Sequence, residues 1–231
     1  MSADEFKRLA ANAAAALVQP EMTLGLGTGS TAAHFIAALA ARVRDGLYVK
    51  GVPTSDETGR RAAAAGIDII EPDETTTIDL AVDGTDEVDG ALNLIKGGGG
   101  ALLREKIVAN AARRFIVIAD SSKKVAQLGR FPLPVEIDRF AFALTVRKIR
   151  SVLSDLGYEG GVRLRASAGG SAFLSDGGNF ILDCPLGRIS DASALDAALK
   201  KVPGVVETGL FIGMADEVIL AGPSGLERLQ R

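Results

Sequence analysis

Hydrophobic and polar positions follow two different periods in the first half of the chain. Short apolar runs predict buried strands, whereas longer stretches with apolar residues three or four positions apart predict amphipathic helices. The expected strands are 22–26, 47–52, 67–71, 80–82 and 115–119, and the expected helices are 3–18, 30–44, 54–65 and 101–114. Because strands and helices alternate, the pattern predicts an α/β fold: a mostly parallel, Rossmann-like open sheet with helices on both faces.

The pattern changes after Gly129. Residues 131–135 are expected to form a proline-marked link, which is followed by a helix, a strand, a hairpin and a second helix. These elements are expected at 143–156, at 162–167, around 175–179 and at 193–201. Their order predicts a smaller α+β subdomain, of ferredoxin-like type, on an antiparallel sheet.

Two last strands, at 207–211 and 217–220, are expected to return to the first sheet or to cap the smaller unit. We therefore expect a Rossmann-like catalytic domain made of 1–130 and 206–231. The smaller α+β subdomain is expected at 131–205, and it is a candidate for oligomerisation. A length of 231 residues suits one domain with a smaller attached unit better than two full domains.

Polar side chains collect just after four of the predicted strands. These clusters are 28–31, 54–56, 83–86 and 120–123. In open α/β sheets, ligands bind beyond the carboxyl ends of the strands. We therefore expect the clusters to meet at one edge of the sheet and to form a site there.

The cluster after the first strand contains Thr28, Gly29, Ser30 and Thr31. Residues 25–31 fit neither the G-x-G-x-x-G spacing nor the P-loop pattern, and no acidic residue ends the second strand, so a dinucleotide site is disfavoured. What remains is a glycine turn with hydroxyls at a helix N-cap, which can hold one phosphate. An ordinary capped turn is the equally weighted alternative.

A second glycine segment precedes the helix at 101–114. Lys96 is followed by four glycines, Gly97 to Gly100, which lack Cβ atoms and let the backbone approach a ligand closely. The helix end beyond them presents N–H groups that suit an anion. Glu105 lies one turn into this helix, and its neighbours three and four positions away are apolar. A carboxylate in such surroundings is paired, protonated or catalytic.

Asp83 and Asp86 flank a turn that contains Gly84 and Thr85. A metal site is the obvious alternative for this acidic turn. The EF-hand pattern fails, because aligning Gly90 with the invariant glycine of that pattern puts Thr85 and Lys96 at ligand positions. No His or Cys lies nearby for a transition metal, so we expect no metal here.

Composition narrows the class of protein further. The chain has 26 Lys and Arg against 29 Asp and Glu, and this net charge of −3 argues against a general nucleic-acid binder. Cys184 is the only cysteine, which excludes an internal disulfide, and it is expected in the core. No apolar run reaches the roughly 20 residues of a membrane span, and the N-terminus lacks a signal-peptide pattern, so a cytoplasmic location is expected.

Five segments, taken together and in order, resemble ribose-5-phosphate isomerase, type A. They are Gly27-Thr28-Gly29-Ser30-Thr31, Asp83-Gly84-Thr85-Asp86-Glu87, Lys96-Gly97-Gly98-Gly99, Leu103-Arg104-Glu105-Lys106 and Ala119-Asp120-Ser121-Ser122-Lys123. The resemblance extends over essentially the whole chain and includes residues 131–136 and 203–211. Leu103 and Gly100 depart mildly from the family pattern, and neither departure removes a functional group.

The resemblance implies an aldose–ketose isomerase that interconverts D-ribose 5-phosphate and D-ribulose 5-phosphate in the non-oxidative pentose phosphate pathway. It implies no metal and no cofactor, no nucleic-acid or membrane partner, and a homodimer or homotetramer. Glu105 is then the base, and Asp83, Asp86 and Lys96 are further catalytic candidates. The implied substrate-binding residues are Lys7, Thr28, Gly29, Ser30, Thr31, Asp83, Gly84, Thr85, Asp86, Lys96, Gly97, Gly98, Gly99 and Lys123.

The implied chemistry agrees with the residues. Isomerisation moves a proton between C2 and C1 through an enediolate, which one desolvated carboxylate can do. Lys96 and loop amides suit the oxyanion, whereas Thr28–Thr31 and Lys123 suit the phosphate. Asp83 and Asp86 are both candidates for opening the sugar ring. The glycine loop is either a mobile lid or a rigid cradle.

Two other functions fit parts of the sequence. An aminosugar-phosphate isomerase or deaminase shares the phosphate turn, but such enzymes typically open the ring with a histidine, and the only histidine here is His34. A sugar-phosphate-sensing regulator would need a DNA-binding unit. The ~20 residues before the first strand are too few for a helix-turn-helix.

Overall fold

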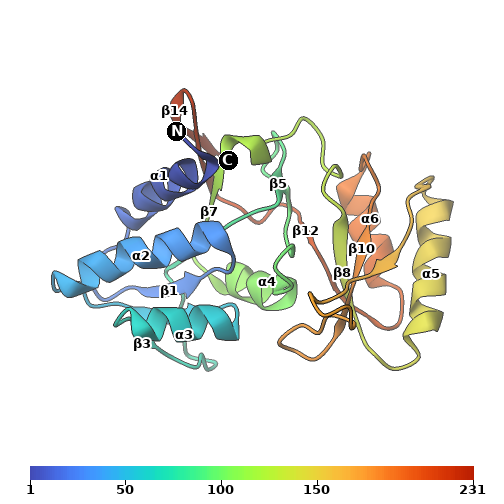
Figure 1. Cartoon of the computed structure of the whole chain (residues 1–231), viewed down its shortest axis with the longest axis horizontal. Coiled ribbons are helices and arrows are strands. Elements are labelled where there is room, and N and C mark those ends of the chain that lie inside the picture. Colours follow the sequence, from blue (N-terminus) through green and yellow to red (C-terminus); the bar gives the residue numbers. More distant parts are fainter. The chain divides into compact units, whose positions relative to one another are not determined.

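The computed structural model describes all 231 residues, which form two compact units (Figure 1). The first unit contains Met1–Thr85, Arg104–Lys124 and Gly213–Arg231, and the second contains Asp86–Leu103 and Val125–Ile212. These bounds differ from the expected ones, because residues 86–103, 125–130 and 206–212 group with the smaller unit.

The first unit is built on a seven-stranded sheet. Its strands are β1 (Thr23–Leu26), β2 (Lys50–Pro53), β3 (Asp68–Ile69), β4 (Leu80–Asp83), β7 (Phe115–Asp120), β13 (Glu217–Gly222) and β14 (Gly225–Gln230). Their order is β14-β13-β7-β4-β1-β2-β3, and every neighbouring pair is parallel except β13 with β14. The predicted mostly parallel sheet is confirmed. The strand β14 was not predicted.

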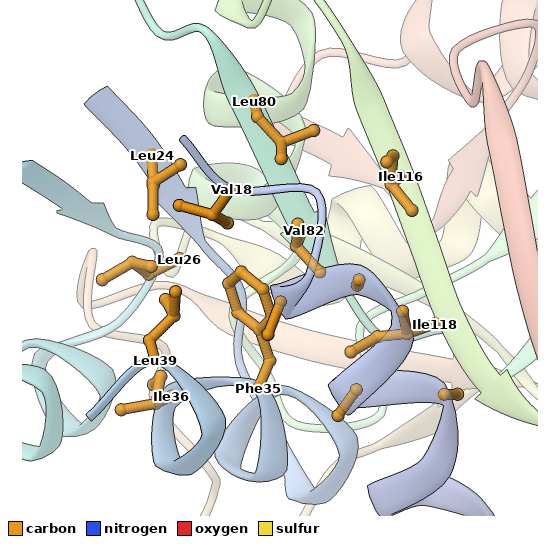
Figure 2. Close-up of a cluster of buried hydrophobic side chains, with 14 of the residues drawn as sticks. Val18, Leu24, Leu26, Phe35, Ile36, Leu39, Leu80, Val82, Ile116 and Ile118 are labelled. Carbon is orange, nitrogen blue, oxygen red and sulfur yellow. The ribbon is translucent and has the colours of Figure 1, made fainter. Parts of the chain in front are cut away.

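Helices cover both faces of this sheet, as expected. They are α1 (Ala3–Ala15), α2 (Ser30–Arg44), α3 (Asp56–Ala64) and α4 (Leu102–Ala111). Figure 2 shows Phe35 of α2 projecting toward Val18, Leu26 and Val82 in a buried apolar cluster. On the opposite face, a Cβ placed on Gly25 of β1 would lie 2.4 Å from Val108 of α4. This glycine therefore lets α4 pack directly on the strand.

The second unit contains the expected ferredoxin-like arrangement. Its elements are β8 (Leu133–Ile137), α5 (Phe142–Asp155), β9 (Arg163–Leu164), β10 (Phe180–Cys184), α6 (Ala192–Lys200) and β11 (Val205–Thr208). The strands form an antiparallel sheet of order β11-β8-β10-β9, and the chain runs βαββαβ. Cys184 is fully buried in this sheet, as predicted.

The expected link at 131–135 is wrong, because Leu133–Ile137 forms the buried strand β8 inside the small sheet. Proline normally disfavours an inner strand, since it has no N–H for the ladder. Pro134 is tolerated because β11 pairs only with residues 135–137 of β8, so the ladder on that side has ended before Pro134. Its carbonyl accepts a hydrogen bond from the Gly209 N–H at 2.7 Å.

The expected strand at 207–211 is two strands in two different sheets. Residues up to Thr208 belong to β11, whereas β12 (Leu210–Phe211) joins β6 (Leu94–Ile95) and β5 (Glu87–Val88) in a small antiparallel sheet. Gly209 separates them. A Cβ at this position would lie 2.3 Å from the carbonyl oxygen of Lys96, so only glycine fits the crossing.

No helix combines the length and apolar character that a membrane span needs.

Candidate active site

The polar clusters that follow β1, β2 and β4, and the cluster that follows β7, lie at one edge of the first unit's sheet. These four strands are parallel and adjacent, in the order β7-β4-β1-β2, so their carboxyl ends share an edge. The prediction that these strand ends share one edge is confirmed, although Asp86 of the cluster 83–86 groups with the second unit. Parallel sheets of this kind hold ligands at that edge.

The turn between β1 and α2 differs from the predicted hydroxyl cap. The N-cap of α2 is Gly29, whose φ is 100°, and no side chain caps the helix. The first N–H groups of α2 are therefore left to water or to a ligand, which is the usual setting of an anion site. Ser30 begins the helix and is exposed, and Thr31 is half-buried beside it.

The Thr28 hydroxyl is used to fix the turn. Its oxygen lies 2.7 Å from the Thr54 hydroxyl and 2.9 Å from the Ser55 hydroxyl, both at the end of β2. Thr58 then donates to the carbonyl oxygen of Gly27 at 3.1 Å. This hydroxyl network includes Thr54, Ser55 and Thr58, which were not among the predicted substrate-binding residues. The polar run after the second strand was the only signal for them.

Asp83 supports the same turn from β4. It is 4% exposed, and its Oδ1 accepts hydrogen bonds from the N–H groups of Thr28 at 3.0 Å and Gly84 at 2.7 Å. A Cβ on Gly27 would lie 2.2 Å from this oxygen, so the carboxylate packs directly on the glycine backbone. The missing Cβ of Gly84 would lie 3.7 Å from Thr31, which brings the ends of β4 and β1 together.

Two lysines of the first unit lie at this edge. The Lys7 ammonium of α1 donates to the Ser30 hydroxyl at 3.0 Å, which places this lysine beside the turn. Lys123 is half-buried in a short 3₁₀ turn, Ser121–Lys123, directly after β7. A cation, helix amides and a hydroxyl that lie together can bind a phosphate group.

Glu105 occupies the position in α4 that the sequence predicted. Only 5% of it is exposed, and its neighbours Leu102, Val108 and Ala109 are buried apolar residues. The adjacent Arg104 points to a different partner, the carboxylate of Asp56 at 2.7 Å. The Glu105 carboxylate is therefore held away from bulk water.

The glycine loop, residues Lys96 to Gly100, belongs to the second unit. Lys96 is 2% exposed, its ammonium lies 5.5 Å from the centre of the Phe211 ring, and its N–H donates to Gly209 at 2.9 Å. Gly97 and Gly100 have φ values of 103° and 85°, which favour glycine. Gly98 and Gly99 are exposed. The predicted passage from a glycine segment into a helix is confirmed.

Asp86 contacts the glycine loop directly. Its Oδ2 accepts a hydrogen bond from the Gly98 N–H at 2.7 Å. A Cβ on Gly98 would lie 2.6 Å from the other oxygen of the same carboxylate, so glycine is required for the approach. One oxygen of this catalytic candidate therefore also holds the loop.

The predicted residues divide between the two units. Lys7, Thr28–Thr31, Asp83–Thr85, Glu105 and Lys123 lie in the first unit, and Asp86 with Lys96–Gly99 lies in the second. His34 has its own partner: its Nε2 lies 2.9 Å from the carboxylate of Asp4, and this hydrogen bond lowers the pKa of Asp4. No group of three or more His, Cys, Asp and Glu is placed to hold a metal ion.

Comparisons with known proteins point to one family. The family model described as ribose 5-phosphate isomerase A (phosphoriboisomerase A) matches residues 50–225. A ribose-5-phosphate isomerase A of Rhodopseudomonas palustris (strain BisB18) is 55% identical over 231 residues, all of both chains. The solved ribose 5-phosphate isomerase of Plasmodium falciparum has a TM-score of 0.93 at 33% identity over 99% of each chain. The solved ribose 5-phosphate isomerase A of Methanocaldococcus jannaschii has a TM-score of 0.91 at 38% identity over 100% of each chain.

Proposed function

The chain belongs to the ribose-5-phosphate isomerase A family, whose reaction interconverts D-ribose 5-phosphate and D-ribulose 5-phosphate, and we propose that Glu105 is its proton-transferring base. One observation carries this proposal: the Glu105 carboxylate is 5% exposed, on the helix that follows the glycine loop. Buried carboxylates among apolar groups are suited to removing a proton from carbon near neutral pH.

The reaction requires the furanose ring to open first. The C1 hydroxyl loses its proton, the ring oxygen gains one, and the bond between C1 and that oxygen breaks to give the aldehyde. We assign this acid–base step to Asp83 and Asp86. Each carboxylate is held by backbone N–H groups, Asp83 by Thr28 and Gly84 and Asp86 by Gly98, so the position of each is fixed.

Glu105 then takes the proton from C2, and the electron pair of that bond forms the C1–C2 double bond of an enediolate while the charge moves to O1. The O2 proton moves to O1, and return of the proton from Glu105 to C1 gives the ketone, so no oxidant is consumed. The developing oxyanion needs preorganised positive charge. We assign this role to the Lys96 ammonium, fixed beside Phe211, and to the loop amides.

The phosphate is assigned to the N-terminus of α2. Its uncapped amides after Gly29, the Ser30 and Thr31 hydroxyls and the ammonium groups of Lys7 and Lys123 supply donors and charge. The hydroxyl turn, residues 27–31, is therefore assigned to the inert end of the sugar. Binding energy from the phosphate then positions C1 and C2.

The test is a coupled assay of Glu105→Gln with ribose 5-phosphate. We expect kcat to fall by about 10³-fold or more, within the range of lost general-base catalysis, while KM changes little. Glu57→Gln, an exposed glutamate on α3, is the matched control and should match the wild type. Near-wild-type turnover of Glu105→Gln contradicts the base assignment. Glucosamine 6-phosphate as substrate tests the aminosugar alternative, and no turnover of it is expected.

We also propose a homodimer or homotetramer that acts in the cytoplasm. Support for assembly comes from exposed apolar side chains of the second unit, Phe140 (88% exposed) and Leu144 (57% exposed), at the start of α5. Exposed apolar patches mark association surfaces. Light scattering of the wild type and of Phe140→Asp tests the assembly. A monomeric wild type contradicts it.

A further inference from the structure

We propose that Arg165 is a positioning residue that fixes the glycine loop through the backbone carbonyl groups of Gly97 and Gly98. The proposal rests on the role assigned above to this loop in substrate binding. Arg165 follows β9, outside every motif and every polar strand end that pointed to the site. It lies in the second unit together with the loop.

The Arg165 side chain donates hydrogen bonds to three residues. Nη1 donates to the carbonyl oxygens of Gly97 at 2.8 Å and Gly98 at 3.2 Å. On the other side of the guanidinium, Nε donates to Asp183 at 3.0 Å and Nη2 donates to the second oxygen of the same carboxylate. The side chain is 13% exposed. Only the rigid guanidinium fork can satisfy a carboxylate and two carbonyl groups together.

Asp183 holds the guanidinium in place from the sheet. It lies in β10, opposite Pro134 of β8, so its backbone is fixed by two neighbouring strands. A bidentate pair of this kind is charge-assisted and defines the plane of the guanidinium. Arg165 is therefore aimed at the loop before any substrate binds.

The peptide between Gly97 and Gly98 is bonded at both of its ends. Its carbonyl accepts from Arg165, and its N–H donates to Asp86. Glycine allows a peptide plane to rotate with little steric resistance, and a half-turn would exchange these two groups. That exchange would place a carbonyl oxygen against the Asp86 carboxylate and an N–H against the Arg165 cation. Two charges of opposite sign thus select one orientation of this peptide.

The next peptide follows from the same contact. The Gly98 carbonyl points to Arg165, and in a trans peptide the N–H points the opposite way. The Gly99 N–H is therefore turned away from Arg165. Gly99 is an exposed residue, and we infer that its amide is a loop donor for the substrate oxyanion.

Phe173 makes a second contact from the same segment. Its ring lies 5.8 Å from the Arg165 guanidinium, and a Cβ on Gly100 would lie 2.4 Å from its Cζ. The Phe173 N–H donates to the Arg165 carbonyl at 2.8 Å, and Ala166 bridges Ala172 between them. Residues 165–173 therefore form one hairpin that contacts the loop at two points.

The test compares Arg165→Gln with Arg147→Gln, an exposed arginine of α5 that serves as the matched control. Measured well below the melting temperature, kcat/KM of Arg165→Gln should fall on the order of 100-fold, because small displacements of positioning groups have effects of that size. Competitive inhibition by inorganic phosphate should stay unchanged, since the hydroxyl turn is untouched. Hydrogen exchange of the Gly98 amide, which is bonded to Asp86, should accelerate in Arg165→Gln and keep its wild-type rate in Arg147→Gln.

Conservative variants keep the proposal testable if Arg165→Gln does not fold. Arg165→Lys keeps the charge but loses the fork, so it should recover less than a tenth of the lost kcat/KM. Asp183→Asn keeps the fork and should show a smaller fall than Arg165→Lys. Two results overturn the proposal. One is wild-type kcat/KM in Arg165→Gln and Arg165→Lys, and the other is phosphate inhibition that weakens in parallel with the loss of kcat/KM. The Glu105→Gln result reports separately on the base assignment, so failure of one proposal does not imply failure of the other.

Discussion

The hydroxyl turn, residues 27–31, and the glycine loop, residues 96–100, both contain glycines ahead of a helix but differ in construction. Each places glycines before the N-terminus of a helix, α2 or α4. The turn is held by neutral hydroxyls and by Asp83, all from adjacent strand ends of one sheet. The loop is held by charged groups, Asp86 and Arg165. Arg165 lies 68 residues after Gly97 and 67 residues after Gly98 in the sequence.

The difference teaches what a glycine motif can and cannot indicate. Glycine marks a place where backbone comes close to something, but it does not say what fixes the backbone there. For the turn, the fixing groups are themselves sequence neighbours of predicted strands. For the loop, Asp86 also follows a predicted strand, but Arg165 reaches the loop only once the ferredoxin-like unit has folded. The following substitutions separate the two constructions.

Gly27→Ala should have the largest effect on stability. Its new Cβ would lie 2.2 Å from the Asp83 carboxylate and 2.6 Å from the Asp83 Cα, which is backbone and cannot move aside. We expect thermal unfolding to show a loss of about 1–3 kcal/mol, as for other overpacked sites, together with a raised KM. Gly84→Ala is the control, because its nearest neighbour lies 3.7 Å away. Equal stability of the two variants contradicts the tight packing of Asp83 on the turn.

Gly100→Ala should be the next largest. Its φ of 85° disfavours an L side chain by roughly 1–2 kcal/mol, and the new Cβ would meet the Phe173 ring. Gly157→Ala isolates the backbone cost, since Gly157 has a φ of 79° and no atom within 4 Å of the added Cβ. We expect kcat/KM to fall only for Gly100→Ala, and the double variant with Phe173→Ala to regain stability. Identical melting temperatures for the two glycine variants would show that the Phe173 contact is unimportant.

Ser55→Ala should cost less. Its hydroxyl accepts the Thr58 N–H at the start of α3 and also belongs to the network around Thr28. Loss of an N-cap costs about 1 kcal/mol, which a thermal melt detects. Ser55→Thr retains the hydroxyl and should keep most of the stability. If KM rises more than stability falls, the network orders the turn in the way we describe. A normal KM would mean that Asp83 alone suffices.

The thiol of Cys184 should stay unreactive in the folded protein. Burial raises the pKa of its thiol to about 12, so almost no thiolate is present at pH 8 and a disulfide reagent should not label the folded protein. The residue follows Asp183 on β10, in the core of the second unit. We expect Gly27→Ala to remain unlabelled, because its damage lies in the first unit. Rapid labelling of that variant would show that the two units do not respond independently.

Most of the α/β architecture could be predicted because buried strands such as β7, with the sequence Phe-Ile-Val-Ile-Ala-Asp, are continuous apolar runs. The strand β14 has no such run, since it is almost fully exposed at the sheet edge. β8 was hidden by Pro134, whose cost depends on where β11 stops pairing. Such information belongs to tertiary structure and not to local sequence.

The candidate site shows the same division. Glu105 was predictable because helical spacing alone puts its carboxylate among apolar neighbours. The gap in the α2 cap was not, because Thr28 could have capped the helix and instead turns to Thr54 and Ser55. Arg165 carries no local signal, since an arginine after a short exposed strand is usual on a protein surface.

Gly209 is a position at which the chain should tolerate no substitution. It lies between two short strands of different sheets, donates to Pro134 and accepts from Lys96. The space beside it is filled by the Lys96 carbonyl oxygen, 2.3 Å from where a Cβ would stand. Any side chain there would displace the backbone of the lysine itself. In a scan of all single substitutions, Gly209 should therefore be as intolerant as a residue of the active site.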